Sequence, residues 1–140
     1  ERQLRTTDGV WTIVMVHQPP FSCSREGDAD VRRAWVESLE RNGVDLVLSG
    51  HEHNYQRLSS ATGTTYIVTG GGGDTLYDVD DDCELRDPTL MAADDDDFHF
   101  FVVEGSRERI DAQAIGMDAS VLDRFTIRSR EKEVDRPAAE

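Results

Sequence analysis

Basic residues and long apolar segments are both scarce in this chain. Its 140 residues include 15 Lys and Arg against 29 Asp and Glu, which gives a formal net charge of −14. A protein that binds nucleic acid through its phosphates needs a basic stripe, so we expect no nucleic-acid partner. No apolar stretch approaches the roughly 20 residues of a membrane-spanning helix, so we expect no membrane insertion. The length allows one domain.

Cysteine is almost absent, since Cys23 and Cys83 are the two cysteines of the chain. Neither lies in a Cys-X-X-Cys motif, which argues against a zinc–thiolate site. The pair could form a disulfide in an oxidising compartment, but separation along the sequence does not establish proximity. A nucleophilic role for Cys23 would require a partner histidine, and the nearest one, His17, is better explained as a metal ligand.

The acidic residues concentrate in two runs, residues 78–82 and 94–97. A calcium-binding loop would need carboxylates at defined positions, and neither run has the spacing of an EF-hand. We therefore interpret both runs as solvated loop.

Three of the four histidines follow short apolar runs. His17 follows residues 10–16, and Gly50-His51-Glu52-His53 follows Leu46-Val47-Leu48. In an extended chain, residues i and i+2 point to the same side, so His51 and His53 should project together while Glu52 points away. Their spacing suits two ions about 3.5–4 Å apart, each bound by one imidazole. Gly50 would let the backbone turn sharply.

A helix is predicted between the two histidine motifs. Residues 28–42 carry one apolar face at helical spacing, an Asp cap at 28 or 30 and an Asn42-Gly43 stop. That face comprises Val31, Ala34, Trp35, Ser38 and Leu39. Residues 10–16 and 45–49 are then parallel strands of one βαβ unit, the first buried on both faces. Both histidine motifs reach the same edge of the sheet, where binding groups collect.

The rest of the chain is predicted to be mostly strands. Residues 64–69 form a strand that ends in the glycine run 70–73, interpreted as a close-approach turn lining the site. Residues 76–93 form an irregular acidic loop. Residues 98–103 and 109–115 form a hairpin, and residues 121–127 add a last strand. His99 lies within an apolar strand and is interpreted as a packing or hydrogen-bonding residue.

These segments together resemble a known family. Val14-Met15-Val16-His17, Gly50-His51-Glu52-His53-Asn54-Tyr55-Gln56-Arg57 and Tyr66-Ile67-Val68-Thr69 with four glycines are similar to the C-terminal half of a calcineurin-like metallophosphoesterase, most closely the purple acid phosphatases. The resemblance implies an α/β fold: a partial sandwich, with a βαβ unit followed by mostly β hairpins and the N-terminal half absent. Residues 1–127 would belong to the catalytic domain and residues 128–140 to a charged tail.

The resemblance also implies roles for individual residues. His17 and His51 match ligands of a second, divalent metal, and His53 matches a ligand of the first. The cofactors would be two metal ions, iron with zinc or manganese, and the substrate a phosphate ester. Tyr55 and Arg57 match a recurrent structural Tyr-X-Arg. Arg25 is a candidate phosphate contact, with a surface role as the alternative.

The departures from the family define the competing hypothesis. The resemblance implies further blocks with an aspartate, a bridging aspartate with a tyrosine, and an asparagine–histidine pair. We interpret the chain as containing none of them, with neither a Gly-Asp-X-X-Tyr nor a Gly-Asn-His pattern. We therefore expect a fragment that is inactive alone and whose partner is the missing N-terminal half. The alternative is a non-catalytic module that keeps the fold and some metal binding. The resemblance is compatible with a secreted or periplasmic location, which the sequence alone does not fix.

Overall fold

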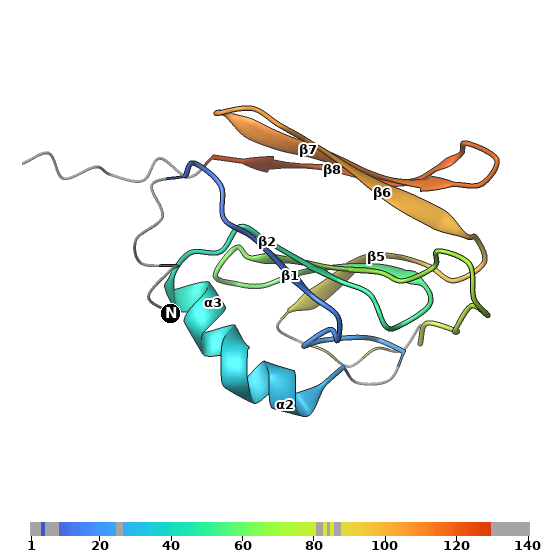
Figure 1. Ribbon diagram of the computed structural model, residues 1–140, viewed down its shortest axis with the longest axis horizontal. Helices are drawn as coiled ribbons and strands as arrows, with labels where there is room; N and C mark the ends of the chain where they lie inside the picture. Colours follow the sequence, from blue (N-terminus) through green and yellow to red (C-terminus); the bar gives the residue numbers. More distant parts are fainter. Residues whose placement is uncertain are drawn as a thin grey trace, which may run out of the picture.

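The molecule consists of two sheets stacked on each other, with helices on the outer face of the larger sheet (Figure 1). The structure is a computed structural model that describes residue 4 and residues 9–24, 27–80, 83, 85 and 88–129. None of the helices in that part of the chain has the length and apolar character needed to cross a membrane. The α/β class predicted from the sequence is confirmed, with strands predominating.

The larger sheet has five strands in the order β1-β2-β4-β3-β5. These are β1 (Ile13–Val16), β2 (Leu46–Ser49), β3 (Tyr55–Ser59), β4 (Thr65–Thr69) and β5 (Thr89–Asp94). β1, β2 and β4 are parallel, and β3 is antiparallel to β4 and β5. The predicted βαβ unit is therefore confirmed, and the carboxyl ends of β1 and β2 meet at one edge of the sheet.

The smaller sheet is an antiparallel meander of β6 (His99–Gly105), β7 (Arg109–Gly116) and β8 (Val121–Arg128). The hairpin and last strand predicted from the sequence are confirmed. Apolar side chains alternate along these strands so that one face covers the larger sheet. Together with Leu46, Tyr55 and Ile67 of the larger sheet, they form the core between the two sheets.

A second core lies between the helices and the other face of the larger sheet. Val47, Leu58 and Tyr66 point to this side, and Leu39 reaches them from the helical segment. Leu46 and Val47 thus serve different cores, as the two-residue period of a strand requires. β2 is buried on both faces because of this, which the sequence predicts for residues 10–16 and not for this strand.

The helical segment differs from the prediction in which residues it buries. It consists of α2 (Ala29–Val31), η1 (Arg32–Val36) and α3 (Glu37–Arg41), where η1 is a turn of π-helix. The wider turn shifts the face that follows it. Val36 packs on the core instead, whereas Trp35 is 47% exposed. The predicted packing of Trp35 is therefore wrong. The Asp28 cap and the end at Asn42 are confirmed.

Two strand predictions need correction. β1 starts at Ile13 and lies at the edge of the sheet, where Ile13 and Met15 are exposed, so it is not buried on both faces. Residues 76–93 are not loop throughout, because Thr89–Asp94 form β5, which pairs with β3. No local pattern in the sequence indicates that β5 pairs with β3. The tail predicted for residues 128–140 lies outside the described residues from position 130 onward.

Candidate metal centre

Two of the predicted ligands come together where the parallel strands end. His17 immediately follows β1, and His51 lies in the short turn that follows β2. The Gly50 N–H donates to the His17 carbonyl at 3.1 Å, which extends the pairing of the two strands by one step. This backbone contact places both imidazoles at the same sheet edge, as the βαβ topology predicts.

The two imidazoles approach with specific nitrogens. The His51 Nδ1 atom lies 3.3 Å from the His17 Nε2 atom, and the rings meet edge to face with centroids 5.2 Å apart. A tetrahedral ion bound at about 2.0–2.1 Å by two imidazole nitrogens would hold those nitrogens about 3.3–3.4 Å apart. The separation therefore fits two ligands of one ion. Both side chains are exposed to solvent, so an ion has access.

The motif that carries His51 and His53 is not extended, contrary to prediction. The Glu52 N–H donates to the Gly50 carbonyl at 2.8 Å, and His51 itself has a φ of 68°. The sharp turn is thus made by His51 rather than by Gly50. A residue with a side chain adopts this conformation at a cost, and such residues cluster at functional sites. Glu52 is buried, in agreement with its predicted orientation away from the ligands.

His53 is held by a different part of the chain. Its Nδ1 atom lies 2.8 Å from the Thr75 carbonyl, and its ring stacks on Tyr77 with centroids 4.3 Å apart and planes inclined by 14°. The Tyr77 N–H donates to the His53 carbonyl at 3.0 Å. Because residues 51–53 form a turn and not an extended strand, the rule that residues i and i+2 point to the same side does not apply to His51 and His53.

The glycine run provides the close approach that was expected of it. A Cβ atom on Gly70 would lie 2.1 Å from the Glu52 carbonyl oxygen, and one on Gly71 would lie 2.6 Å from the His99 ring. Only glycine lets the end of β4 come this near to the histidine turn. His99 is buried and pairs with Thr69 through Nε2 at 3.1 Å, so its predicted hydrogen-bonding role is confirmed.

Tyr55 and Arg57 join the two sheets through Asp123. The Tyr55 hydroxyl donates to the Asp123 carboxylate at 2.7 Å, and Arg57 donates to both oxygens of that carboxylate. Burial, and then the carboxylate, raise the pKa of Tyr55. Burial alone would raise the pKa of Asp123, but hydrogen bonds from Arg57 and Tyr55 and the charge of Arg57 lower it. This supports the structural role predicted for Tyr55 and Arg57.

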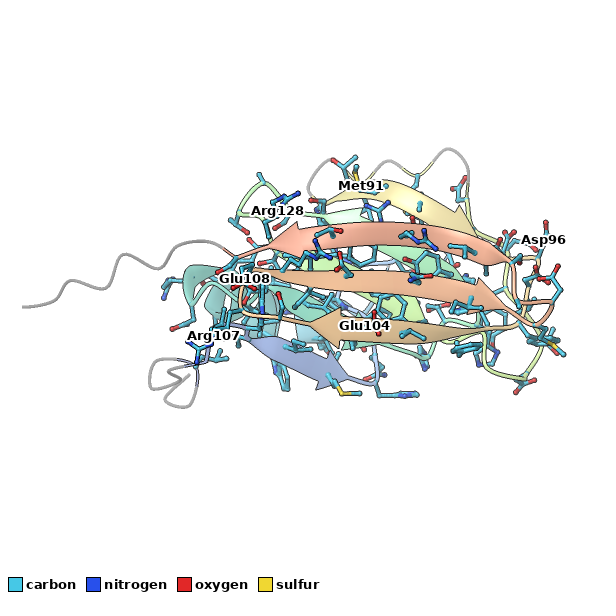
Figure 2. The ribbon with its side chains drawn as sticks, turned by 90° about the horizontal axis from the view of Figure 1, so that it is seen from above. Met91, Asp96, Glu104, Arg107, Glu108 and Arg128 are labelled. Carbon is cyan, nitrogen blue, oxygen red and sulfur yellow. A yellow bond between two sulfur atoms is a disulfide. The ribbon has the colours of Figure 1, made fainter. Side chains whose placement is uncertain are left out.

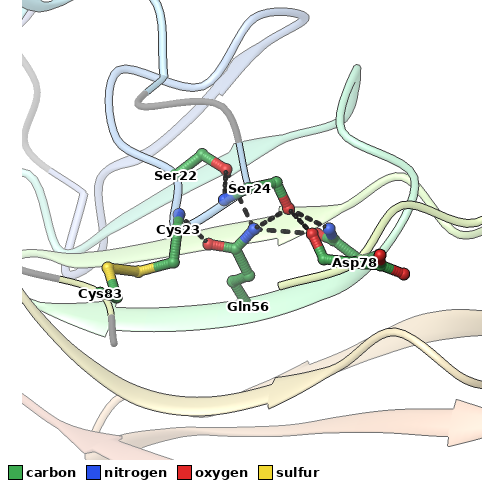
Figure 3. The surroundings of a disulfide bond; sticks show 7 residues. Ser22, Cys23, Ser24, Gln56, Asp78 and Cys83 are labelled. Carbon is green, nitrogen blue, oxygen red and sulfur yellow. Dashed lines mark hydrogen bonds between the residues drawn. A yellow bond between two sulfur atoms is a disulfide. The ribbon is translucent and has the colours of Figure 1, made fainter. Parts of the chain in front are cut away.

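A buried polar network lies beside a disulfide (Figure 3). Cys23 and Cys83 form this bond, with Cα atoms 5.4 Å apart, which resolves the alternatives that the sequence left open. The side chain of Gln56 is fully buried, accepts from the Cys23 N–H at 2.7 Å and donates to Ser22. Asn54 is also fully buried, next to His53 in the sequence, and donates to the Tyr77 carbonyl at 2.9 Å.

The three histidines do not form a complete site in this part of the chain. Among the described residues, no group of three or more His, Cys, Asp and Glu is arranged to hold a metal ion. Arg25, the predicted phosphate contact, lies outside the described residues. The assignment of His17, His51 and His53 as ligands stays a prediction. The structure brings the imidazoles of His17 and His51 together.

The sequence contained one further signal near His53. The interpretation that the chain lacks a Gly-Asp-X-X-Tyr pattern is wrong, because Gly73-Asp74-Thr75-Leu76-Tyr77 has this spacing, after the histidines. Its tyrosine stacks on His53, and the Asp74 carboxylate accepts from the Thr75 N–H at 2.7 Å. This spacing could have drawn attention to the segment that contacts His53, which the other sequence arguments missed.

Comparison with known proteins identifies relatives of this chain. The model of the calcineurin-like phosphoesterase family matches residues 2–55, which include all three predicted ligands. Purple acid phosphatase 17 of Arabidopsis thaliana is 28% identical over 92 residues, covering 65% of this chain and 27% of that protein. The chain is thus similar to calcineurin-like phosphoesterases in sequence over its first part and to a purple acid phosphatase over 65% of its length. It spans only part of the length of these relatives. The matched region is 17% of an uncharacterised Mycobacterium tuberculosis protein and 27% of Arabidopsis purple acid phosphatase 17.

Two solved structures share the fold of nearly the whole chain. The purple acid phosphatase PPD1 from yellow lupin superposes with a TM-score of 0.73 at 22% identity, over 91% of this chain and 27% of its own. GAP50, the anchor in the inner membrane complex of Plasmodium, gives a TM-score of 0.78 at 19% identity, over 94% of this chain and 40% of its own. At these identities the likeness concerns the fold.

Proposed function

We propose that the chain carries part of the metal centre of a phosphoesterase that hydrolyses phosphate esters. The observation that supports this most directly is the 3.3 Å separation of His51 Nδ1 and His17 Nε2 at the ends of two parallel strands. In a family of phosphoesterases, that spacing suits two ligands of one divalent ion, zinc or manganese. His53 would contribute to a neighbouring ion, for which iron is the expectation from the resemblance.

The chain's own residues would supply ligands and their orientation. Ions held by His17, His51 and His53 would supply Lewis-acid chemistry, namely polarisation of a phosphoryl oxygen and activation of water. His17 and His51 would each bind an ion through an unprotonated ring nitrogen. The left-handed backbone at His51 and the close approach of Gly70 fix the turn on which the ligands lie. Pre-oriented ligands lose less conformational entropy on binding.

We further propose that this domain is completed by additional strands from the same protein. β1 and β6 are the edge strands on one side of the two sheets, as Figure 2 shows from above. A cavity of about 690 Å³ lies between them, lined by apolar residues of both strands together with His17. Met15 is 78% exposed on β1 and Phe100 57% on β6. Unpaired edges with apolar side chains favour a missing partner.

A non-catalytic module is the second candidate. Two observations favour it: the described residues lack a third ligand beside the His17–His51 pair, and GAP50, an anchor by its description, has the same fold. On this hypothesis the chain keeps the fold and binds at most one ion, without turnover. The two candidates differ in the number of ions bound by the complete protein and in hydrolysis.

Zinc binding tests the metal centre directly. We expect the His17→Ala and His51→Ala variants to lose zinc affinity by at least tenfold in competition with a chromogenic chelator. His99→Gln is the matched control, because His99 is a buried histidine that hydrogen-bonds Thr69 and should not affect zinc binding. Unchanged affinity in both alanine variants would exclude the pair as ligands and with it the proposed function.

A further inference from the structure

The segment from Thr75 to Tyr77 makes three separate contacts with His53. The Thr75 carbonyl meets the imidazole Nδ1 atom, the Tyr77 ring covers its face, and the Tyr77 N–H binds its backbone carbonyl. A carbonyl oxygen only accepts hydrogen bonds, so Nδ1 must carry the proton. The Nε2 atom is then unprotonated and is the nitrogen that can bind a cation. A hydrogen bond of this kind on the second nitrogen typically orients a metal-binding histidine.

Several contacts anchor the Thr75–Tyr77 segment and the residues that follow it. The Tyr77 carbonyl accepts from Asn54, and the neighbouring Asp78 carbonyl accepts from Ser24 at 2.9 Å. Further along, the Asp80 N–H donates to the Cys23 carbonyl at 2.8 Å, and Cys83 is covalently bound to Cys23. The Val79 N–H donates to the Asp95 carboxylate at 2.6 Å, and Val79 packs on the core beneath the helices. The disulfide adds a covalent cross-link to these contacts.

The two ends of the disulfide are held very differently. Cys23 is buried, and its N–H binds the fully buried Gln56 of β3, which also binds Ser22 (Figure 3). Cys83 is partly buried against the same core, and its N–H donates to the Asp80 carbonyl of its own loop at 3.2 Å. Breaking the bond should therefore leave the Cys23 side in place and free the loop side. Movement of the loop would displace Tyr77, and the contacts of Tyr77 with His53 would then weaken.

We propose that Tyr77 is a positioning residue for His53 and that the Cys23–Cys83 disulfide keeps it in place, so that a dithiol reductant loosens the His53 site. In the reaction, the S–S bond accepts two electrons and two protons to give two cysteine thiols, while the dithiol becomes a cyclic disulfide. The inference about metal binding rests on the proposed function. The inference about the orientation of His53 does not, because it concerns the metal-free protein.

Variants of Tyr77 in the full chain test the positioning role. In the metal-free protein, long-range nitrogen–proton NMR should show the Nδ1-protonated form of His53, which Tyr77→Phe keeps and Tyr77→Leu reduces. Zinc affinity at His53 should fall about tenfold in Tyr77→Leu and stay unchanged in Tyr77→Phe. If the phenylalanine variant loses as much as the leucine variant, the phenol itself binds the ion and the positioning role is wrong. An unaffected leucine variant would also overturn it.

Reduction tests the dependence on the disulfide. Because the chain has two cysteines and both are in this bond, a dithiol acts at one place only. We expect reduction to raise amide hydrogen exchange at residues 75–80 and to weaken the His53 tautomer preference, with His17 and His51 resonances unchanged. The double variant Cys23→Ser, Cys83→Ser should behave like the reduced protein and ignore the reductant. Unchanged exchange and tautomer after complete reduction would overturn the proposal. If these metal-free signals change as expected but the oxidised chain binds no zinc, the proposed function fails while the positioning role stands.

Discussion

Arg57 of β3 and Asp123 of β8 form a two-point ion pair that joins the two sheets. The Arg57 Nε and Nη2 atoms lie 2.6 and 3.2 Å from the two oxygens of Asp123. Both side chains are largely shielded, with 18% and 10% of their surface exposed. Arg57 also lies over the Phe125 ring, 4.8 Å from its centre. Since β3 directly follows the histidine turn, this pair fixes the smaller sheet relative to the candidate site.

Asp123→Asn should destabilise the fold by about 3 kcal/mol at neutral pH, because it leaves Arg57 buried without its countercharge. The pKa of Asp123 is lowered in the fold, so its stabilising effect is present above the unfolded value of about 3.9 and is lost as the pH falls through the lowered folded value. The difference between wild type and variant should therefore shrink in acid. Urea unfolding across pH 2 to 7 measures both effects, with the exposed Asp96→Asn as control. A difference independent of pH would contradict this account.

Leu39→Ala should destabilise the fold more than Trp35→Ala, although tryptophan has the larger side chain. Leu39 is 4% exposed in the core between helix and sheet, so its truncation should cost about 2–5 kcal/mol. Trp35 is 47% exposed after the π-helical turn, so its truncation should cost less than about 1 kcal/mol. Denaturant unfolding of the two variants measures the ranking. A larger loss of stability for Trp35→Ala would support the regular helix face, with Trp35 packed on the core, that the sequence predicted.

Gly70→Ala should disrupt the metal centre, whereas Gly72→Ala should leave it intact. The added methyl group on Gly70 would lie 2.1 Å from the Glu52 carbonyl oxygen, so the turn that carries His51 must move. The same group on Gly72 meets no atom within 4 Å. We expect a loss of about 1–3 kcal/mol in stability and at least tenfold in zinc affinity for the first variant. Equal behaviour of the two variants would show that the close approach is not required.

The sequence predicts those features that depend on short-range pattern. The order of strand, helix and strand, the stop at Asn42 and the β6–β7 hairpin follow from apolar period and turn residues, and all are confirmed. Their topology alone brings His17 and His51 together. The pattern failed where an irregular turn changed the period, as at η1, because one wider turn moves Trp35 to the surface and Val36 to the core.

Features that depend on distant partners could not be predicted in the same way. β5 is a strand because β3 offers an edge to pair with, and its own sequence, Thr-Leu-Met-Ala-Ala-Asp, has a weak strand pattern. The stacking of Tyr77 on His53 depends on a loop returning across 24 residues. The disulfide joins residues 60 apart, and sequence spacing carries no information about such a contact.

The last prediction is that these 140 residues are a poor enzyme alone and become active when the domain is completed. Three imidazoles without a bridging carboxylate offset the repulsion between two dications poorly, so the second ion should bind weakly. We expect hydrolysis of p-nitrophenyl phosphate close to background with the chain alone, at matched zinc or manganese concentration. Strands supplied in cis or as a second chain along β1 and β6 should restore turnover, and His51→Ala in that protein should abolish most of it. Full activity of the chain alone would mean that the ligand set is assigned wrongly. An inactive completed protein that still folds and binds zinc would favour the non-catalytic module.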